Sequence, residues 1–386
     1  MPHIEPIQSL TLDLPPSCIE FWPDDSRYAV VGTYNLEKQT SDKSGSAEEG
    51  RAESQRRNGS LILLHVGKDN VSKIIHTLST PSAILDIHFT PKAPPNSVFG
   101  VATSTGAIGI YDLKQFVKLE NSDAPPEVTH LRTVQFFPED TLVTAFSWHP
   151  KGTLVGMTLS TGQVCLGDID LNNPLDSAPC WDMTPHELEA WTLAFSPDGT
   201  GLYSGGDDSV LRFTELPEIS ALNHEEIDVE TPSASWTDKK IHGAGVTAIL
   251  PLTASEEGVL VLTGSYDDHI RLIYVPIAGR RKILAELNIG GGVWRLKCLN
   301  KFAPSSPIDQ HSHEILLLVS CMHAGARILR LSEGQDEQWR FEVLAKFEEH
   351  KSMNYGSDCQ PALNEKGQRT FVTTSFYDRL LCLWRF

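Results

Sequence analysis

Short apolar segments separated by turn-forming residues run along the whole of this chain. Runs rich in Val, Ile, Leu, Phe and Tyr alternate with clusters of Gly, Pro, Asp and Ser, and a helical period of apolar residues is nearly absent. Short runs bounded by such clusters are typical of β-strands joined by tight turns. The pattern therefore predicts an all-β protein.

One pattern occurs three times and indicates that the strands are organised as repeats. Each copy has an apolar strand, a tight turn with an aspartate and a second apolar strand, and the copies are residues 204–212, 263–272 and 374–384. Self-similarity at a spacing of tens of residues is the signature of a repeat architecture. If the repeats close into a ring, the aspartate-bearing turns gather on one face.

Seven such units can be traced, each beginning with an apolar strand. They begin near Cys18, Ala83, Val143, Trp191, Val246, Val293 and Tyr355. Division of 386 residues among seven units gives roughly 55 each, above the about 40–45 of a WD40 blade. The polar stretch 37–59 accounts for part of the excess, and we expect it to be a disordered insertion within the first blade. The prediction is a single-domain, seven-bladed WD40 β-propeller over residues 1–386.

The seventh unit ends in a strand at Phe386, so its blade needs one more strand from elsewhere. We expect the N-terminal strand, residues 7–12, to pair with the C-terminal strand. Such pairing closes the ring and removes exposed sheet edges.

The composition narrows the partners of this chain. A formal net charge of −18 argues against binding along a phosphate backbone, which needs basic patches. The first residues lack the features of a signal peptide, and the longest apolar run, 315–322, is too short to cross a bilayer. Seven cysteines without CxxC or zinc-site spacing suit a reducing compartment. We expect a cytoplasmic monomer without a metal, a nucleic-acid partner or a membrane partner.

In a propeller, the loops that enter the innermost strands lie on the same face as the turns between the second and third strands. Both sets carry polar and aromatic side chains in this sequence. The loops supply His186, Glu189, Trp191, Trp294 and Tyr355, and the turns supply Asp207, Tyr266, Asp267, His323, Tyr377 and Asp378. The five aromatic residues beside acidic ones favour a pocket for a cationic group, because ring faces attract quaternary ammonium.

Structural roles remain open for several of these residues. Asp267 and Asp378 either accept backbone N–H groups within their turns or face a ligand. His186 is either a structural histidine of its loop or a functional one. His323 stands where the other turns have aspartate, so it is either a substituted turn residue or a proton-transfer group. The standard catalytic motifs are missing, and without further information the default function is protein interaction.

Several segments together resemble the WD-repeat family of diphthamide biosynthesis, the diphthine methyl ester esterases often described as diphthine methyltransferases. These segments are residues 32–34, 82–86, 189–191, 204–208, 263–270, 291–295, 321–325 and 375–378. They extend from the first blade to the last. One departure is that Thr214 and Ile273 stand where blades of this kind often end in Trp, which concerns blade packing rather than the pocket.

The resemblance implies a carboxylic methyl ester hydrolase without a cofactor. Its partner and substrate would be elongation factor 2, which carries a methylated diphthine side chain on a histidine. Hydrolysis would release methanol and diphthine, and the trimethylammonium group of that side chain would suit an acidic, aromatic mouth. The alternative is a non-catalytic WD40 scaffold or adaptor for protein assembly or trafficking.

Ester hydrolysis needs a nucleophile, a proton acceptor and donors for the developing oxyanion. We expect His323 or His186 to activate a water, Asp207 or Glu189 to orient that base, and Arg295 to stabilise the oxyanion. The expected substrate-binding residues are Trp191, Trp294, Tyr355, Tyr266, Tyr377, Asp267 and Asp378. A covalent route through Ser375 or Cys321 is the alternative, although neither has a neighbour in sequence that would activate it.

Overall fold

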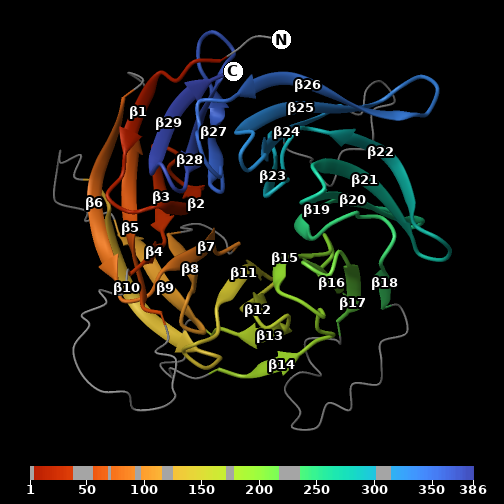
Figure 1. Cartoon of the computed structure of the whole chain (residues 1–386), viewed down its shortest axis with the longest axis horizontal. Coiled ribbons are helices and arrows are strands. Elements are labelled where there is room, and N and C mark those ends of the chain that lie inside the picture. Colours follow the sequence, from red (N-terminus) through yellow and green to blue (C-terminus); the bar gives the residue numbers. More distant parts are fainter. Residues whose placement is uncertain are drawn as a thin grey trace, which may run out of the picture.

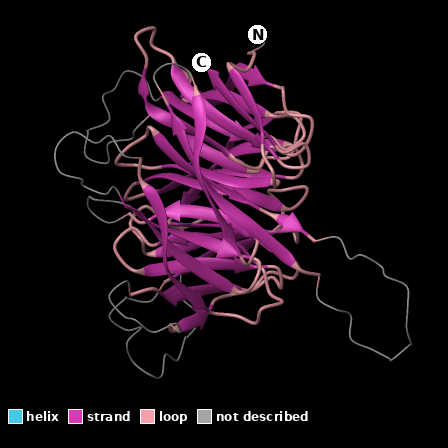
Figure 2. Cartoon of the chain, turned by 90° about the vertical axis from the view of Figure 1, so that its left-hand side faces the viewer, coloured by secondary structure: helices cyan, strands magenta, loops and turns pink. Residues whose placement is uncertain are grey.

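The computed structural model describes residues 4–37, 55–67, 71–91, 97–114, 125–170, 178–216, 235–300 and 314–386 of the chain. These residues form seven antiparallel sheets around a central axis, and they contain no helix (Figures 1 and 2). The predicted seven-bladed β-propeller is confirmed. None of the described segments is a helix that could cross a membrane.

Each blade begins at the axis with an innermost strand. The innermost strands are β2 (Pro16–Phe21), β7 (Ile84–Phe89), β11 (Val143–Trp148), β15 (Ala190–Phe195), β19 (Val246–Ala254), β23 (Arg295–Cys298) and β27 (Ser357–Leu363). The second strands are β3 (Tyr28–Thr33), β8 (Val98–Thr103), β12 (Leu154–Leu159), β16 (Gly201–Gly206), β20 (Gly258–Ser265), β24 (Glu314–Ser320) and β28 (Arg369–Ser375).

The outer half of each blade consists of two further strands. The third strands are β5 (Arg57–Val66), β9 (Ala107–Lys114), β13 (Val164–Asp168), β17 (Leu211–Glu215), β21 (His269–Pro276), β25 (Ala326–Glu333) and β29 (Leu380–Arg385). The outermost strands are β6 (Ser72–Thr80), β10 (Glu127–Gln135), β14 (Cys180–Asp182), β18 (Trp236–Asp238), β22 (Lys282–Asn288), β26 (Trp339–Phe347) and β1 (Gln8–Thr11).

The hydrophobic core lies between the blades rather than at the axis. Each pair of neighbouring blades shares one cluster of buried apolar side chains, including the pair formed by the seventh and first blades. The second strands β3, β12 and β16 are buried along their full length because both of their faces pack on a neighbour. The outermost strands β6 and β10 are instead mostly exposed or half-buried, with two buried residues each. This difference explains why the sequence mixes continuous apolar runs with more polar ones.

The first and last strands close the ring as predicted. Strand β1 pairs with β29 in antiparallel register, with Gln8 opposite Leu383 and Thr11 opposite Leu380. Backbone N–H groups of Ile7 and Leu12 extend this pairing on either side. The two termini therefore lie close together in Figure 1.

The predicted insertion within the first blade is shorter than its expected bounds. Residues 38–54 lie outside the described residues. On either side of them, β4 (Asn35–Leu36) pairs with Arg57 and Asn58 of β5, and the carboxamides of Asn35 and Asn58 are hydrogen bonded. The edges of the range 37–59 were wrong because residues 57–59 belong to a strand, where Gly59 lies opposite Thr80 of β6.

Candidate active site

Four of the predicted aromatic residues meet around Trp294, which immediately precedes the innermost strand β23. The Trp294 ring centroid lies 5.7 Å from that of Trp191, 6.4 Å from Tyr266 and 4.7 Å from Tyr355. These residues come from the fourth, fifth, sixth and seventh blades, so the circular arrangement of the blades brings them together. We call Trp191, Tyr266, Trp294 and Tyr355 the aromatic group.

The fifth predicted aromatic residue, Tyr377, lies outside this group. Its side chain is exposed and its ring packs edge-on against Phe376 at 5.1 Å. Phe376 in turn lies 5.5 Å from Tyr355 and 6.0 Å from Tyr34. Sequence reasoning did not select Phe376 or Tyr34, although both belong to segments that carry the family resemblance.

Asp207 supplies a carboxylate beside the aromatic group, where the Trp191 indole is its nearest polar neighbour. It follows strand β16, and its backbone N–H donates to the Glu189 carbonyl oxygen at 2.8 Å. Oδ1 of Asp207 and Nε1 of Trp191 are buried and, among the described residues, have no hydrogen bond of ordinary geometry, but the Trp191 N–H still interacts with the Asp207 carboxylate. Burial raises the pKa of the Asp207 carboxyl, the Trp191 indole partly offsets the rise, and the charges of Glu189 and Asp208 add to it. Asp207 is therefore poised to exchange a proton or to face a cation.

The other two predicted groups of the acid–base set are exposed. Glu189 lies in the loop before β15, close enough for its charge to act on Asp207. His323 occupies the turn between β24 and β25, next to Met322, which has a φ of 42°. Within the described part of the chain, no carboxylate is hydrogen bonded to His323 to orient its ring. The two residues stay predictions.

His186 does not belong to the site, contrary to the prediction that it activates water. Its side chain is fully buried, Nδ1 donates to Asp208 at 2.9 Å, and the Ser204 hydroxyl donates to Nε2 at 3.0 Å. Burial lowers the pKa of His186, although the Asp208 carboxylate opposes this change. The lowered pKa favours the neutral ring. With both ring nitrogens bonded inside the fourth blade, His186 holds its loop onto the sheet.

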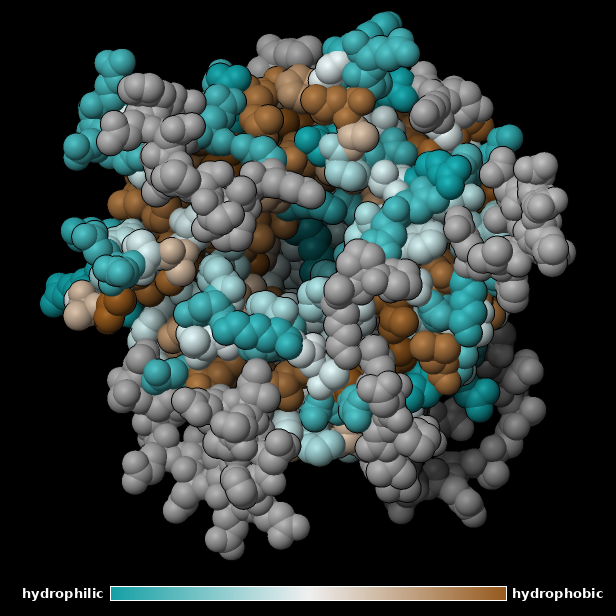
Figure 3. All heavy atoms as spheres, turned by 180° about the vertical axis from the view of Figure 1, so that it is seen from behind, coloured by the Kyte–Doolittle hydropathy of each residue, from teal (hydrophilic) through white to brown (hydrophobic). Residues whose placement is uncertain are grey.

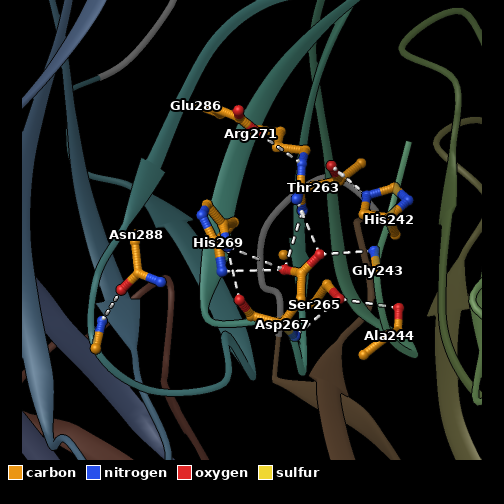
Figure 4. Close-up of polar contacts among 12 residues, drawn as sticks. His242, Gly243, Ala244, Thr263, Ser265, Asp267, His269, Arg271, Glu286 and Asn288 are labelled. Atoms are coloured by element: carbon orange, nitrogen blue, oxygen red, sulfur yellow. Dashed lines mark hydrogen bonds and ion pairs between the residues drawn. The ribbon is translucent and has the colours of Figure 1, made fainter. Parts of the chain in front are cut away.

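Asp267 and Asp378 also have structural roles, so their assignment as substrate-binding residues was wrong. Asp267 accepts the Gly243 N–H at 2.8 Å and forms an ion pair with Arg271 at 2.9 Å (Figure 4). Burial opposes this charge, but Arg271 and backbone N–H groups outweigh it and lower the pKa of Asp267 to about 2. Asp378 accepts the Lys351 N–H and the Ser352 hydroxyl. Satisfied carboxylates of this kind hold turns rather than ligands.

Two further histidines anchor equivalent loops and make the fold sensitive to acid. His242 bonds Thr263 (Figure 4). His350 bonds Thr373 in the same way, and burial lowers the pKa of each ring to about 4. Above pH 6.5 each ring is neutral in both the folded and the unfolded chain. As the pH falls from 6.5 towards 4, only the unfolded chain gains these protons, so stability is lost.

We therefore expect the free energy of unfolding to fall between pH 7 and pH 4.5 by about 2–3 kcal/mol for each histidine. Urea titrations at several pH values measure this loss. The double variant His242→Gln, His350→Gln should show a flatter dependence on pH. An unchanged free energy of unfolding across this range in the native chain would contradict the assignment.

A cavity of about 230 Å³ with several charged side chains in its wall lies between the innermost strands β2, β7, β23 and β27. Tyr355 lines it, as does Arg295, the residue after Trp294. Seen from behind, the centre of the ring is hollow and hydrophilic residues lie at its depth (Figure 3). The aromatic group and the cavity are therefore neighbours that share Tyr355.

Arg295 reaches across the channel instead of lying free at the mouth. Its Nη2 donates to Oδ1 of Asp86 in the second blade at 2.7 Å. Asp86 also contacts His88 at 3.3 Å, and His88 bonds Glu20 at 3.0 Å. Burial opposes the charge on His88, but Asp86 and Glu20 outweigh it and raise the pKa of His88 to about 10. Among the described residues, Asp86 binds one guanidinium nitrogen of Arg295, and 28% of the Arg295 side chain remains exposed, so it can still donate into the cavity.

The covalent alternatives are excluded by burial. Ser375 is fully buried and bonded to Ser352, and Cys321 is fully buried with a pKa raised to about 12 by burial. A thiol of this kind is not an activated nucleophile. Within the described residues, no three His, Cys, Asp or Glu side chains are arranged to hold a metal ion.

Comparisons with known proteins agree with this architecture. The WD domain, G-beta repeat family matches residues 178–214. A chain of the mitotic checkpoint complex superposes with a TM-score of 0.59 at 16% identity, covering 100% of this chain and 92% of that chain. Sqt1 from Chaetomium thermophilum gives 0.60 at 17% identity, covering 99% and 89%. At such identities these likenesses show the fold alone.

Relatives of similar sequence indicate a particular family as well as the fold. The diphthine methyltransferase of Schizosaccharomyces pombe is 30% identical over 94% of each chain. The Saccharomyces cerevisiae protein of the same name is 26% identical over 98% of this chain and 97% of its own length. The human one is 28% identical over 94% of this chain and 76% of its own length. On this evidence the chain belongs to the diphthine methyltransferase family.

Proposed function

We propose that this protein acts in diphthamide biosynthesis by hydrolysing the methyl ester of diphthine on elongation factor 2, with release of methanol. Family membership supports the pathway. One structural observation carries the chemistry: the Asp207 carboxylate, whose pKa is raised by burial, lies beside the aromatic group, and Tyr355 of that group also lines a cavity with charged walls. A methyl-transfer reaction would require a methyl donor, whereas hydrolysis of the ester requires water and a base.

The aromatic group is suited to the trimethylammonium group of diphthine. A quaternary ammonium ion has no hydrogen to donate, so ring faces and a nearby negative charge are what recognise it. Each ring contributes about 0.5–2 kcal/mol when it lies over the cation. Trp191, Trp294 and Tyr266 supply the faces, and Asp207 supplies the charge.

When the ammonium group is bound at the aromatic group, the methyl ester of the substrate lies at the cavity. In diphthine methyl ester, the ammonium nitrogen and the ester carbon are attached to the same carbon, so their two binding sites must touch. Tyr355 belongs to both the aromatic group and the cavity wall, and Arg295 follows Trp294 directly. An ammonium group held at Trp294 therefore places the ester carbonyl within reach of Arg295.

The reaction follows from these positions. Asp207 takes a proton from water as the water oxygen bonds to the ester carbon, and the carbonyl electron pair moves onto oxygen, which Arg295 stabilises. Collapse breaks the bond to the methoxy group, which takes the proton from Asp207 and leaves as methanol. The acid product loses its proton to solvent. A raised pKa helps Asp207 hold the proton between these steps.

Replacement of Trp294 tests the ammonium site. Trp294→Ala should raise the KM for modified elongation factor 2 about tenfold, because the loss of a desolvated cation–π contact costs about 1–2 kcal/mol. Trp294→Phe keeps a ring and should lie between this variant and the native protein. Methanol release measures both. An unchanged KM in Trp294→Ala would remove the aromatic group from the substrate site.

Replacement of Arg295 tests the oxyanion site. Arg295→Ala should lower kcat about 100-fold, the effect typical of a lost oxyanion donor, with little change in KM. Arg330→Ala is the control, since Arg330 forms exposed ion pairs with Glu314 and Glu342 on the outer side of the sixth blade. A kcat for Arg295→Ala equal to that of the control would show that another group stabilises the oxyanion.

A further inference from the structure

The aromatic ring of Tyr266 lies between two loops. The residues of these loops that face the ring, Gly245 and Gly292, are glycines. A Cβ built on Gly245 would lie 2.9 Å from Cδ2 of Tyr266 and 2.9 Å from Oδ1 of Asp207. A Cβ built on Gly292 would lie 3.4 Å from Cδ1, on the opposite edge of the same ring, and 2.8 Å from Sδ of Met322. Both glycines therefore leave space that the Tyr266 ring and its neighbours occupy.

The loop that carries Gly245 is fixed in place. The Tyr266 N–H donates to the Gly245 carbonyl oxygen at 2.9 Å, and the Ser265 hydroxyl donates to that of Ala244 at 2.9 Å. The Gly243 N–H is bound to Asp267 (Figure 4). Because the loop cannot retreat, any atom added at residue 245 must displace Tyr266 or Asp207.

We propose that Gly245 and Gly292 set the width of the ammonium pocket by holding the Tyr266 ring between them, which makes both of them specificity-determining positions. The inference rests on the proposed function, because it takes the pocket beside Tyr266 to bind a quaternary ammonium group. The two positions differ in what they touch. Gly245 faces a carboxylate and a ring edge, whereas the nearest atom to Gly292 belongs to the flexible end of Met322.

This difference predicts a graded effect on binding of tetramethylammonium, the simplest probe of the pocket. Gly245→Ala separates Asp207 from Tyr266 and should raise the Kd at least tenfold. Gly292→Ala should raise it about threefold, because Met322 can move aside. Gly243→Ala is the matched control in the same loop, since its Cβ would lie 3.5 Å from Asp267, an ordinary contact, and it should bind as the native protein does.

A double-mutant cycle separates a role through Tyr266 from a general structural role. In a Tyr266→Ala background, Gly245→Ala should raise the Kd by less than it does in the native background, because the space left by the ring can take up the added methyl group and the displaced Asp207 carboxylate. Titration calorimetry gives the Kd, and thermal unfolding checks that each variant is folded. Native-like binding by Gly245→Ala, or full additivity in the cycle, would overturn the proposal while leaving the ammonium pocket intact. A native protein that does not bind tetramethylammonium would overturn the pocket itself.

Discussion

Asp207→Asn is expected to lower kcat for hydrolysis of the diphthine methyl ester by about 100- to 1000-fold. A positioned general base contributes about 10²–10⁴ to such reactions, and the amide cannot accept the proton of the attacking water. Asp207 lies beside the aromatic group with the Trp191 indole as its neighbour, and burial raises its pKa, which favours a carboxylate that can hold a proton during the reaction. Methanol release at saturating substrate measures the effect.

The neighbouring aspartate provides a sharp control. Asp208 receives hydrogen bonds from His186, Glu187 and Val210, so Asp208→Asn should reduce stability and leave kcat near that of the native protein at a temperature where the variant is folded. His323→Ala examines the other expected base. Loss of kcat in His323→Ala with retention in Asp207→Asn would assign the proton transfer to His323 and contradict our account.

Trp384→Ala should reduce the free energy of unfolding by about 3–5 kcal/mol, the usual cost of removing a buried aromatic side chain. Trp384 is fully buried in strand β29. Its ring stacks on Phe371 at 4.3 Å and on Phe347 at 4.9 Å, and its Nε1 donates to the Thr373 hydroxyl at 3.1 Å. This side chain joins the sixth and seventh blades next to the strand pairing that closes the ring.

Trp384→Phe is the companion variant. It keeps the stacking and loses the hydrogen bond to Thr373, so it should cost clearly less than Trp384→Ala. Urea unfolding followed by circular dichroism gives both values. If Trp384→Ala lowers the free energy of unfolding by less than about 1 kcal/mol, the stability of the propeller does not depend on this contact.

The fold could be predicted from the sequence because each blade repeats the same physical pattern. Strand β16 reads as a continuous apolar and small-residue run, and the turn after it carries Asp208 followed by Ser209 with a positive φ of 60°. Asp268 and Arg379 have the same backbone conformation after Asp267 and Asp378. These equivalent turns in three blades make the repeat visible without any knowledge of contacts.

The site was only partly predictable, because position along the repeat does not show which way a side chain points. His186 and Asp207 both lie at the mouth by sequence, yet His186 turns into its blade and Asp207 faces the aromatic group. The ion pair between Arg295 and Asp86 joins residues 209 positions apart, and only closure of the ring brings them together. Phe376 was missed because its contacts with Tyr355 and Tyr34 join residues far apart in the sequence.

The most direct test of the central claim is the mass of elongation factor 2 that carries the diphthine methyl ester, measured before and after incubation with this protein. We expect the native protein to remove one CH₂ unit from the modified histidine without an added methyl donor, and Asp207→Asn to leave that mass unchanged over the same period. A mass that stays unchanged with the native protein, or that rises by one CH₂ unit when a methyl donor is supplied, would contradict the assignment as an esterase.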